Sequence, residues 1–515
     1  MLDAKTHRII YLVLLTLLGV TMVCSTWAAN LMWVLLGVNW LFEGRWQEKW
    51  QMLKHSRTLH AYLAMWLLLA IGLLWSSNLE EGLHVMQVSL PLLVVPLVVL
   101  TTPAVEGSAR RTILWLYSCT VAVIAVIATV RMLTIEDIPY REAVPYISHI
   151  RFALNCCMVF FIAFGTALAL SRGKKRTRTT RLAVVGAMAM AAWMLVFLLL
   201  LRSYTAVAVL FVASLAVILV HYRRWWTIGL WVLAVAVLAT AVGVEVKNYY
   251  RLVPIATAPL QPRTANGNAY EHACDGIVEN GNYVNNYICP AELRTAWEQR
   301  STMPYDSCSA TGYSVEPTLV RYLNAIGQTK DSAGVATLST EQIADIERGV
   351  ANPVYTTGSP LRKMVYVMLF EREYYVHTSA VRGFTMLQRL ELWRATARVI
   401  SDNPLFGVGT GDAFDAVHAQ LEADQSELRK TAKRTHNQYL TLMAMFGVLG
   451  FAVVLGFGIR ASWRRASTVA PLMLVWAVAV LLSFITEDTL DTLAGILFCT
   501  WFLAFRRRTA LPVEQ

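Results

Sequence analysis

The stretch Lys433–Gly458 decides the fold, and it reads KRTHNQYLTLMAMFGVLGFAVVLGFG. A short basic and polar segment leads into an apolar run of about twenty residues, the length that an α-helix needs to cross a hydrocarbon core of roughly 30 Å. The sequence therefore predicts a membrane-spanning helix here, with His436 and Asn437 at its polar entrance.

Apolar runs of similar length recur along the whole chain. Of its 515 residues, 56% are hydrophobic and only 15% are charged, whereas soluble proteins carry about 25% charged residues. Because a membrane β-barrel would show short alternating strands instead, the pattern predicts an all-α polytopic membrane protein. Hydropathy predicts about twelve spans, at 9–27, 28–43, 60–76, 86–103, 112–130, 151–171, 182–201, 203–220, 227–245, 437–459, 468–486 and 490–505.

Basic residues in the loops predict the orientation of these spans, because Lys and Arg accumulate in cytoplasmic loops. The basic loops fall on one side if there are twelve spans and the N-terminus is inside, and they lie at 43–57, 108–111, 171–181, 221–226, 460–465 and 506–508. The opposite loops are acidic or mixed. We therefore expect both termini in the cytoplasm, and we attribute the net charge of +11 to topology rather than to nucleic-acid binding.

This topology predicts three segments. Residues 1–245 would hold nine spans, residues 246–435 would form one large, mainly helical region on the far side, and residues 436–515 would hold three spans and a cytoplasmic tail. In a bacterium, the far side of the inner membrane is the periplasm. The stretch 255–340 contains Cys274, Cys289 and Cys308. These three residues allow at most one internal disulfide, whose pairing stays open.

Polar residues at the outer helix ends are the informative ones, since a charge near hydrocarbon costs several kcal/mol unless it is compensated. Arg202 stands at an outer turn between two spans, either as a snorkelling anchor or as a site residue. Arg389, Trp393 and Arg394 belong to an amphipathic helix. Its basic face would contact either lipid phosphate or a bound anion.

His436 has two interpretations. Thr435 and Gln438 have the spacing of a capping box, which predicts a helix starting at His436. A helix N-terminus disfavours a protonated imidazole, and a neutral imidazole is what a general base requires. His436 is therefore either an ordinary polar residue at the water interface or a catalytic base.

Glu487, Asp488 and Asp491 form an acidic cluster at the same outer level. They could orient His436, bind a divalent cation or cap the last helix. No His or Cys accompanies them, which argues against a transition-metal site. Together, two arginines and a base on one face describe a site for a lipid-linked anionic donor.

Three blocks in this order resemble the O-antigen ligase superfamily. They are RLELWRATARVISDNPLFGVGTGD from Arg389, RTHNQYLTLMAMFGVLGF from Arg434 and TEDTLDTLAGILF from Thr486. Members of the superfamily include lipopolysaccharide O-antigen ligases, Wzy-type polymerases and protein O-oligosaccharyltransferases. Arg202 also fits the family pattern, although Tyr204 follows it where the family has small residues.

The resemblance implies a GT-C-like glycosyltransferase of the inner membrane that needs neither a metal nor another cofactor. Its donor would be a glycan on undecaprenyl pyrophosphate, and its acceptor in the ligases would be a sugar of lipid A–core. His436 would deprotonate the acceptor hydroxyl, while Arg202 and Arg389 would bind the pyrophosphate. Asn437, Trp393, Arg394, Glu487 and Asp488 would support the site.

Several alternatives remain open. A polymerase or a protein O-oligosaccharyltransferase would share the donor and the chemistry, and it would differ in its acceptor. A flippase for lipid-linked sugars would need a charged path through the bilayer. The predicted spans carry few charges, and the ionisable residues gather at one surface, so the sequence favours surface chemistry.

Overall fold

The chain is described by a computed structural model that covers residues 2–135, 138–173, 177–222, 224–273, 276–309, 312–378, 381, 384–431, 434–462 and 470–506. Helices dominate this part of the chain, and the strands are limited to one short hairpin. The chain divides into two compact units, residues 1–229 with 389–515 and residues 230–388.

All twelve predicted apolar segments are helical in the described residues, which supports a helical, multi-pass membrane protein. Among the described residues, nine helices are long and apolar enough to cross a membrane. These are α1 (Ala4–Cys24), α4 with η1 (Arg57–Trp75), α5 (Leu79–Thr101), α6 (Gly107–Thr134), α7 (His149–Arg172), α8 (Arg178–Leu200), α9 with η2 (Tyr204–Tyr222), α10 (Trp225–Tyr250) and α20 (Gln438–Ser462, of which Gln438–Ala461 qualifies). Three apolar helices are shorter: α2 (Thr26–Phe42), α21 (Pro471–Thr486) and α22 with η6 (Leu493–Phe505).

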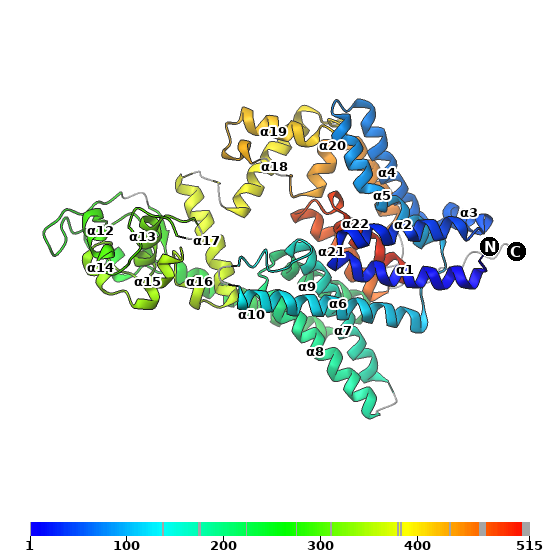
Figure 1. Cartoon of the computed structure of the whole chain (residues 1–515), viewed down its shortest axis with the longest axis horizontal. Coiled ribbons are helices and arrows are strands. Elements are labelled where there is room, and N and C mark those ends of the chain that lie inside the picture. Colours follow the sequence, from blue (N-terminus) through cyan, green and yellow to red (C-terminus); the bar gives the residue numbers. More distant parts are fainter. Residues whose placement is uncertain are drawn as a thin grey trace. The chain divides into compact units, whose positions relative to one another are not determined.

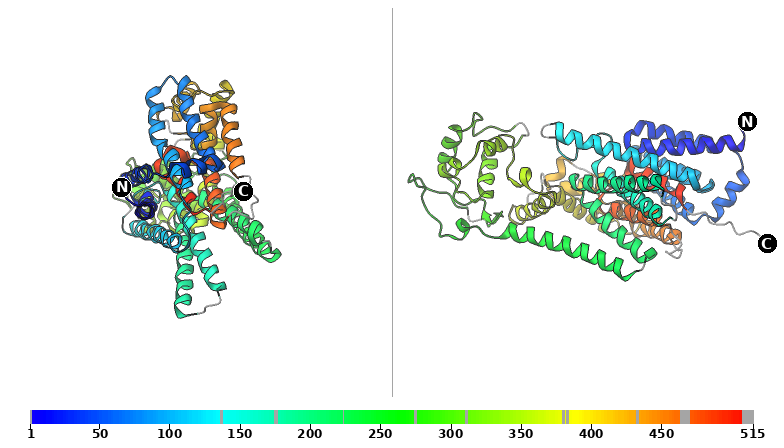
Figure 2. Two further views of the ribbon diagram at one scale, coloured as in Figure 1. Left: turned by 90° about the vertical axis from the view of Figure 1, so that its right-hand side faces the viewer. Right: turned by 90° about the horizontal axis from the view of Figure 1, so that it is seen from below.

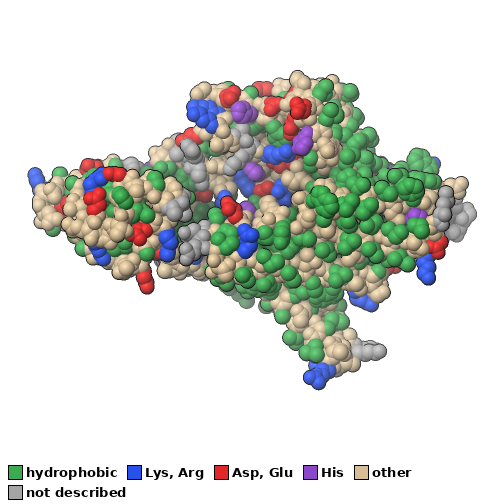
Figure 3. Space-filling model, viewed as in Figure 1, with side chains coloured by type: hydrophobic (Ala, Val, Ile, Leu, Met, Phe, Trp, Pro, Cys, Tyr) green, Lys and Arg blue, Asp and Glu red, His purple; other side chains and the backbone are tan. Residues whose placement is uncertain are grey.

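The larger unit holds all of these helices except most of α10, and it also contains the polar elements α3 (Trp46–His55), α18 (Thr385–Asp402, from Arg389 on), α19 (Ala413–Ala423), η3 (Glu427–Lys430) and η5 (Thr489–Asp491). The helices α7 and α8 pack side by side as an antiparallel pair, as do α1 and α2 (Figures 1 and 2). Large apolar side chains remain exposed on the helices, and they cover much of the face in Figure 3. A surface of this kind suits lipid contact.

The core of this unit is packed around the last helix. Trp501 is fully buried and donates from Nε1 to the carbonyl of Leu15 at 2.9 Å. A Cβ added at Gly19 would lie 2.3 Å from the Trp501 ring, so glycine lets α1 approach the indole. Segments from the two ends of the chain are therefore locked together.

A break in α20 positions the loop between α18 and α19. Gly447 has φ +62° inside the helix, a value that side-chain-bearing residues rarely adopt. The loop runs alongside the break, where the Val448 amide donates to the Pro404 carbonyl and the Val408 amide donates to the Ala444 carbonyl. Backbone groups freed by the break are thus satisfied by another segment, as a non-aqueous environment requires.

The smaller unit contains the remainder of α10, the hairpin β1–β2 (Val278–Glu279 and Asn282–Tyr283) and the helices α11 (Pro254–Thr257), α12 (Pro290–Glu298), α13 (Val315–Ala325), α14 (Ser332–Ala336), α15 (Thr340–Glu347), α16 (Val354–Thr357) and α17 (Pro360–Thr378). A buried polar network joins the hairpin to α13, with Glu279 accepting from Arg321 at 3.0 Å. Cys289 and Cys308 are free, and Cys274 lies outside the described residues.

Candidate functional site

Four segments of the larger unit meet at the candidate site. They are α18, the residues leading into α20, the first turn of α7 and the segment Glu487–Asp491 between α21 and α22. Figure 3 shows charged and histidine side chains gathered between α18 and α21. Polar groups of four separate segments therefore converge where the sequence predicted an outer face.

Glu487 is the centre of this arrangement. Its side chain is only 9% exposed, and Arg389 donates from Nη2 to Glu487 Oε1 at 2.8 Å. Arg151 Nη2 lies 3.8 Å from Glu487 Oε2, and His436 Nδ1 lies 3.8 Å from the same oxygen. Two guanidinium groups and one imidazole thus share one buried carboxylate.

The His436 backbone lies outside the helix and is held by Asp488. Its φ is +55°, which places it in the left-handed region. The His436 amide donates to Asp488 Oδ2 at 2.7 Å, and the Thr441 hydroxyl donates to Asp488 Oδ1 at 2.7 Å. Asp488 is buried, and one of its carboxylate oxygens holds the backbone that presents the imidazole while the other binds the Thr441 side chain on α20. The imidazole itself is 30% exposed.

The predicted capping box is wrong. The helix α20 begins at Gln438 rather than His436, and Asn437 caps it by accepting from the Tyr439 amide at 3.1 Å and the Leu440 amide at 3.2 Å. Gln438 Oε1 instead accepts from the Leu490 amide at 2.7 Å. Asn is as good a cap as Thr, and it stands closer to the apolar run. His436 is thereby released from the helix.

Trp393 and Arg394 have different positions on α18. Trp393 donates from Nε1 to the Thr435 carbonyl at 3.1 Å, so it anchors the residue before His436. Arg394 is exposed. Arg389 and Arg394 are five residues apart, and side chains at this spacing point to different faces of an α-helix. Arg394 therefore does not share the Arg389 side of α18.

Arg202 also has positive φ, at +51°, and it lies in the turn between α8 and α9. Its guanidinium lies over the Tyr140 ring, 5.3 Å from the centroid. The nearby Thr205 hydroxyl is 2.9 Å from the hydroxyl of Thr486, the residue before Glu487. The start of α9 is therefore tied to the acidic segment.

Two site residues were missed by the sequence reasoning. Arg151 lies in the first turn of α7, where the criterion that singled out Arg202 applies equally, an ionisable residue at the outer end of a predicted span. Arg434 pairs with Asp491 at 2.6 Å, and its guanidinium stacks 4.7 Å from the Phe414 ring centroid. The signal for Arg434 was its place two residues before His436.

Burial and charge shape the protonation of the acidic segment. Burial alone would raise the pKa of Glu487, but His436, Arg389 and Arg151 outweigh it and hold that pKa below its ordinary value. Burial raises the pKa of Asp488, and burial with repulsion from Asp488 raises the pKa of Asp491. Glu487 is thus the fixed negative charge of the cluster.

The two arginines beside Glu487 retain unused donor capacity. Neither Arg151 Nε nor Arg389 Nε has a hydrogen-bond partner among the described residues, although both atoms are buried. A buried donor without a partner costs roughly 1–3 kcal/mol. The arrangement therefore suits an additional anionic ligand. Within the described residues, no group of three His, Cys, Asp or Glu side chains is placed to hold a metal ion.

Comparison with known proteins gives one result that bears on this site. A search of curated proteins finds no match. Residues 360–455 match the family model described as O-antigen ligase, and this segment includes Arg389, Trp393 and His436. It starts before the first block that carried the resemblance and ends before Glu487. The match confirms the resemblance of residues 360–455 to the O-antigen ligase superfamily.

Proposed function

We propose that this protein is an O-antigen ligase, a glycosyltransferase that moves a glycan from undecaprenyl pyrophosphate to a sugar hydroxyl of lipid A–core. The observation that carries the proposal is the convergence of Arg389, Arg151 and His436 on Glu487. Arginine suits a pyrophosphate because its planar guanidinium binds phosphate oxygens in pairs. An imidazole beside those arginines places a base next to the bound leaving group.

The proposed reaction is a single displacement with inversion at the anomeric carbon. His436 accepts the proton of the acceptor hydroxyl, and the hydroxyl oxygen forms a bond to that carbon as the bond to the pyrophosphate oxygen breaks. The electron pair of the broken bond leaves on undecaprenyl pyrophosphate. Arg389 and Arg151 stabilise this growing negative charge by electrostatic complementarity, with Arg202 as a third cation.

Glu487 is assigned two tasks in this scheme. With Nδ1 of His436 facing Glu487, Nε2 is the atom left to receive the acceptor proton. The carboxylate then stabilises the imidazolium that forms, as a carboxylate does in other base–carboxylate pairs. Glu487 also keeps the two arginines in place before the donor binds, and their buried Nε atoms have no hydrogen-bond partner among the described residues.

Aspartate and asparagine residues support the base rather than react. Asp488 holds the backbone of His436, and Asn437, the next residue, caps the start of α20. Trp393 fixes Thr435 on the other side. These three contacts would hold the imidazole in one position and orientation. Catalysis by proximity and orientation requires a catalytic group that is fixed in this way.

The proposed location follows from the distribution of basic loops and from the family resemblance. The site would face the periplasm from the inner membrane, both termini would be cytoplasmic, and residues 246–435 would form the large outer region between the ninth and tenth spans. The donor lipid would reach the site from the membrane. No metal or other cofactor takes part in the proposed reaction.

Analysis of the cell envelope of a deletion strain tests the acceptor. A ligase predicts lipid A–core without polymer, while polymer still accumulates on the carrier lipid. Loss of chain length alone would instead indicate a Wzy-type polymerase, and loss of glycan from a protein would indicate a protein O-oligosaccharyltransferase. Complementation with the wild-type gene and with an Arg389→Gln variant is the matched control, because only the former should restore the product.

A further inference from the structure

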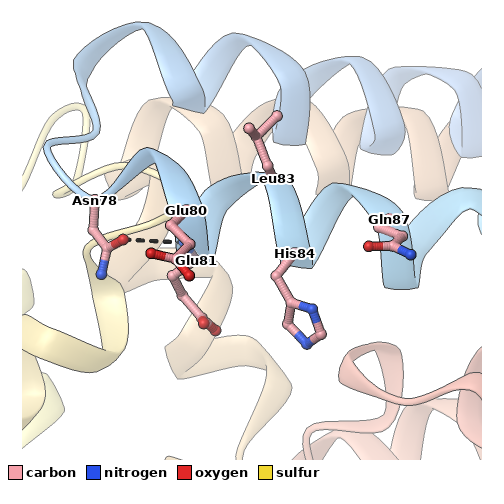
Figure 4. A pocket seen from close by; sticks show the side chains of 6 residues that line it. All are labelled: Asn78, Glu80, Glu81, Leu83, His84 and Gln87. Atoms are coloured by element: carbon pink, nitrogen blue, oxygen red, sulfur yellow. Dashed lines mark hydrogen bonds between the residues drawn. The ribbon is translucent and has the colours of Figure 1, made fainter.

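The first turns of α5 line a cavity of about 470 Å³. No residue of this cavity has a role in the reaction proposed above. Its lining comes from one short segment and consists of Asn78, Glu80, Glu81, Leu83, His84 and Gln87. Figure 4 shows the side chains of Glu81 and His84 extending from α5 into this space. The space is open to the surface rather than enclosed, and its volume is within the range of roughly 300–1,000 Å³ that small-molecule sites occupy.

The polar side chains of this cavity lie in an unusual place. The helix α5 is long and apolar enough to cross a membrane, yet Glu80, His84 and Gln87 follow one another at spacings of four and three residues. Such spacings put side chains on one face of a helix. Glu80 and His84 precede the apolar run predicted from residue 86, so this face lies at the polar end of α5.

A short series of contacts joins the cavity to the candidate site. Asn78 donates from Nδ2 to Asp415 Oδ2 at 2.7 Å, in the first turn of α19. The neighbouring Phe414 ring lies under the guanidinium of Arg434, two residues before His436. The helix α5 also contacts η5, which carries Asp491. The segment that lines the cavity is therefore in contact with the elements that bind Arg434 and carry Asp491.

The chemistry of the cavity differs from that of the arginine cluster. Glu80 and Glu81 would repel a pyrophosphate, so the donor's diphosphate is excluded as an occupant. Carboxylate, imidazole and carboxamide groups together provide several hydrogen-bond acceptors and donors. A ligand rich in hydroxyl groups can form hydrogen bonds with all of them. A neutral or amino-bearing sugar fits both the charge and the hydrogen-bonding pattern.

We propose that Glu80, Glu81, His84 and Gln87 form a saccharide subsite that holds a sugar ring next to the reacting centre. This inference rests on the proposed glycosyl transfer. It assigns sugar binding to α5, whereas the arginines beside Glu487 bind the pyrophosphate. The sugar can come from two sources, the acceptor or the glycan of the donor. Both present the same hydroxyl-rich chemistry.

Steady-state kinetics on the purified full-length protein in lipid nanodiscs test the subsite. The variants are His84→Ala, Gln87→Ala and their combination, since both side chains are exposed and their truncation should leave the fold intact. His55→Ala, an exposed histidine on α3, is the matched control. Loss of two hydrogen bonds to a sugar should raise one KM about tenfold to a hundredfold, with kcat changed less than about threefold.

The kinetic arms distinguish the two sources. A raised KM for lipid A–core at saturating donor assigns the subsite to the acceptor. A raised KM for undecaprenyl-pyrophosphate glycan at saturating acceptor assigns it to the donor glycan. If neither KM moves in the double variant while His55→Ala also behaves as wild type, the subsite is refuted.

A binding measurement separates this inference from the proposed function. Saturation-transfer NMR with a soluble, uncharged core-type oligosaccharide should give a signal with wild-type protein and with His436→Ala, and a signal at least about threefold weaker with the double variant. Equal signals in wild type and the double variant would overturn the subsite. Full transfer activity in His436→Ala would instead overturn the proposed base, whatever the oligosaccharide signal shows.

Discussion

Replacing Glu487 with Gln should lower kcat strongly and tighten the binding of the donor. The substitution keeps the shape of the side chain and removes the charge that Arg389, Arg151 and His436 share. Two unit charges 4 Å apart interact with about 4 kcal/mol at an effective dielectric constant of 20. His436 is 30% exposed, so solvent screening reduces its share to about half of that value.

A loss of about 2 kcal/mol in the stabilisation of the imidazolium corresponds to a fall of roughly 30-fold in kcat. The donor should respond in the opposite direction. Without the carboxylate, Arg389 and Arg151 have no internal counter-charge, and a pyrophosphate would become their main partner. We therefore expect the KM for undecaprenyl-pyrophosphate glycan to fall several-fold while the KM for the acceptor is unchanged.

The assay is initial-rate glycan transfer by purified protein, followed by the gel shift of the acceptor, with donor and acceptor varied in turn. Glu106→Gln, an exposed carboxylate at the start of α6, is the control for loss of one negative charge. A thermal unfolding curve checks that Glu487→Gln is folded. A kcat within twofold of wild type in a folded variant would refute the role assigned to Glu487.

Three further predictions concern stability. Gly447→Ala should destabilise the protein by at least about 2 kcal/mol in thermal unfolding, because its Cβ would meet the Leu405 backbone at 2.3 Å in a left-handed conformation, whereas Gly456→Ala, with open space around it, should be neutral or mildly stabilising. Asn437→Ala should cost about 1 kcal/mol through the lost cap of α20, and Asn437→Asp should restore most of it. Burial lowers the pKa of Lys330 to about 7, so the unfolded chain binds more protons above that pH, and stability should rise with pH by about 2 kcal/mol between pH 7.5 and 9.5. Lys330→Met should remove that rise in unfolding curves recorded at both pH values, and an unchanged pH slope in the variant would assign it to other groups.

The sequence was sufficient for the helical elements because hydrophobic runs of membrane length leave few alternatives. It also singled out Arg389, His436 and Glu487 as candidates, since polar residues at the ends of apolar segments stand out there. Their mutual contact could not be read from the sequence, because α18, the start of α20 and the segment after α21 meet only through tertiary packing.

The cap of α20 was predicted wrongly and the break within α20 was not predicted, each for a physical reason. Thr435 and Gln438 match a capping pattern, but Asn437 competes for the same helix end and takes it, while Gln438 binds the Leu490 amide. Spacing alone cannot decide between two good caps. The break at Gly447 was equally hidden, because a glycine inside an apolar run is common, and only the loop from Pro404 explains its conformation.

Arg151 was missed for a different reason. Its outer helix position matched that of Arg202, but no motif near it pointed to a site, and its relevance comes from the distance to Glu487. Arg151 also lies outside the matched family segment. Structural proximity therefore adds a residue that neither the local sequence pattern nor the family match supplies.

The most direct measurement is glycan transfer from undecaprenyl-pyrophosphate glycan to purified lipid A–core by wild type and by His436→Ala. The account predicts product with wild type and a fall of about a hundredfold or more in kcat with the variant, since general-base catalysis contributes typically 10²–10⁴-fold. Donor binding should persist because Arg389 and Arg151 remain. Transfer by a folded His436→Ala protein at a rate near wild type would contradict the assignment of His436 as the base.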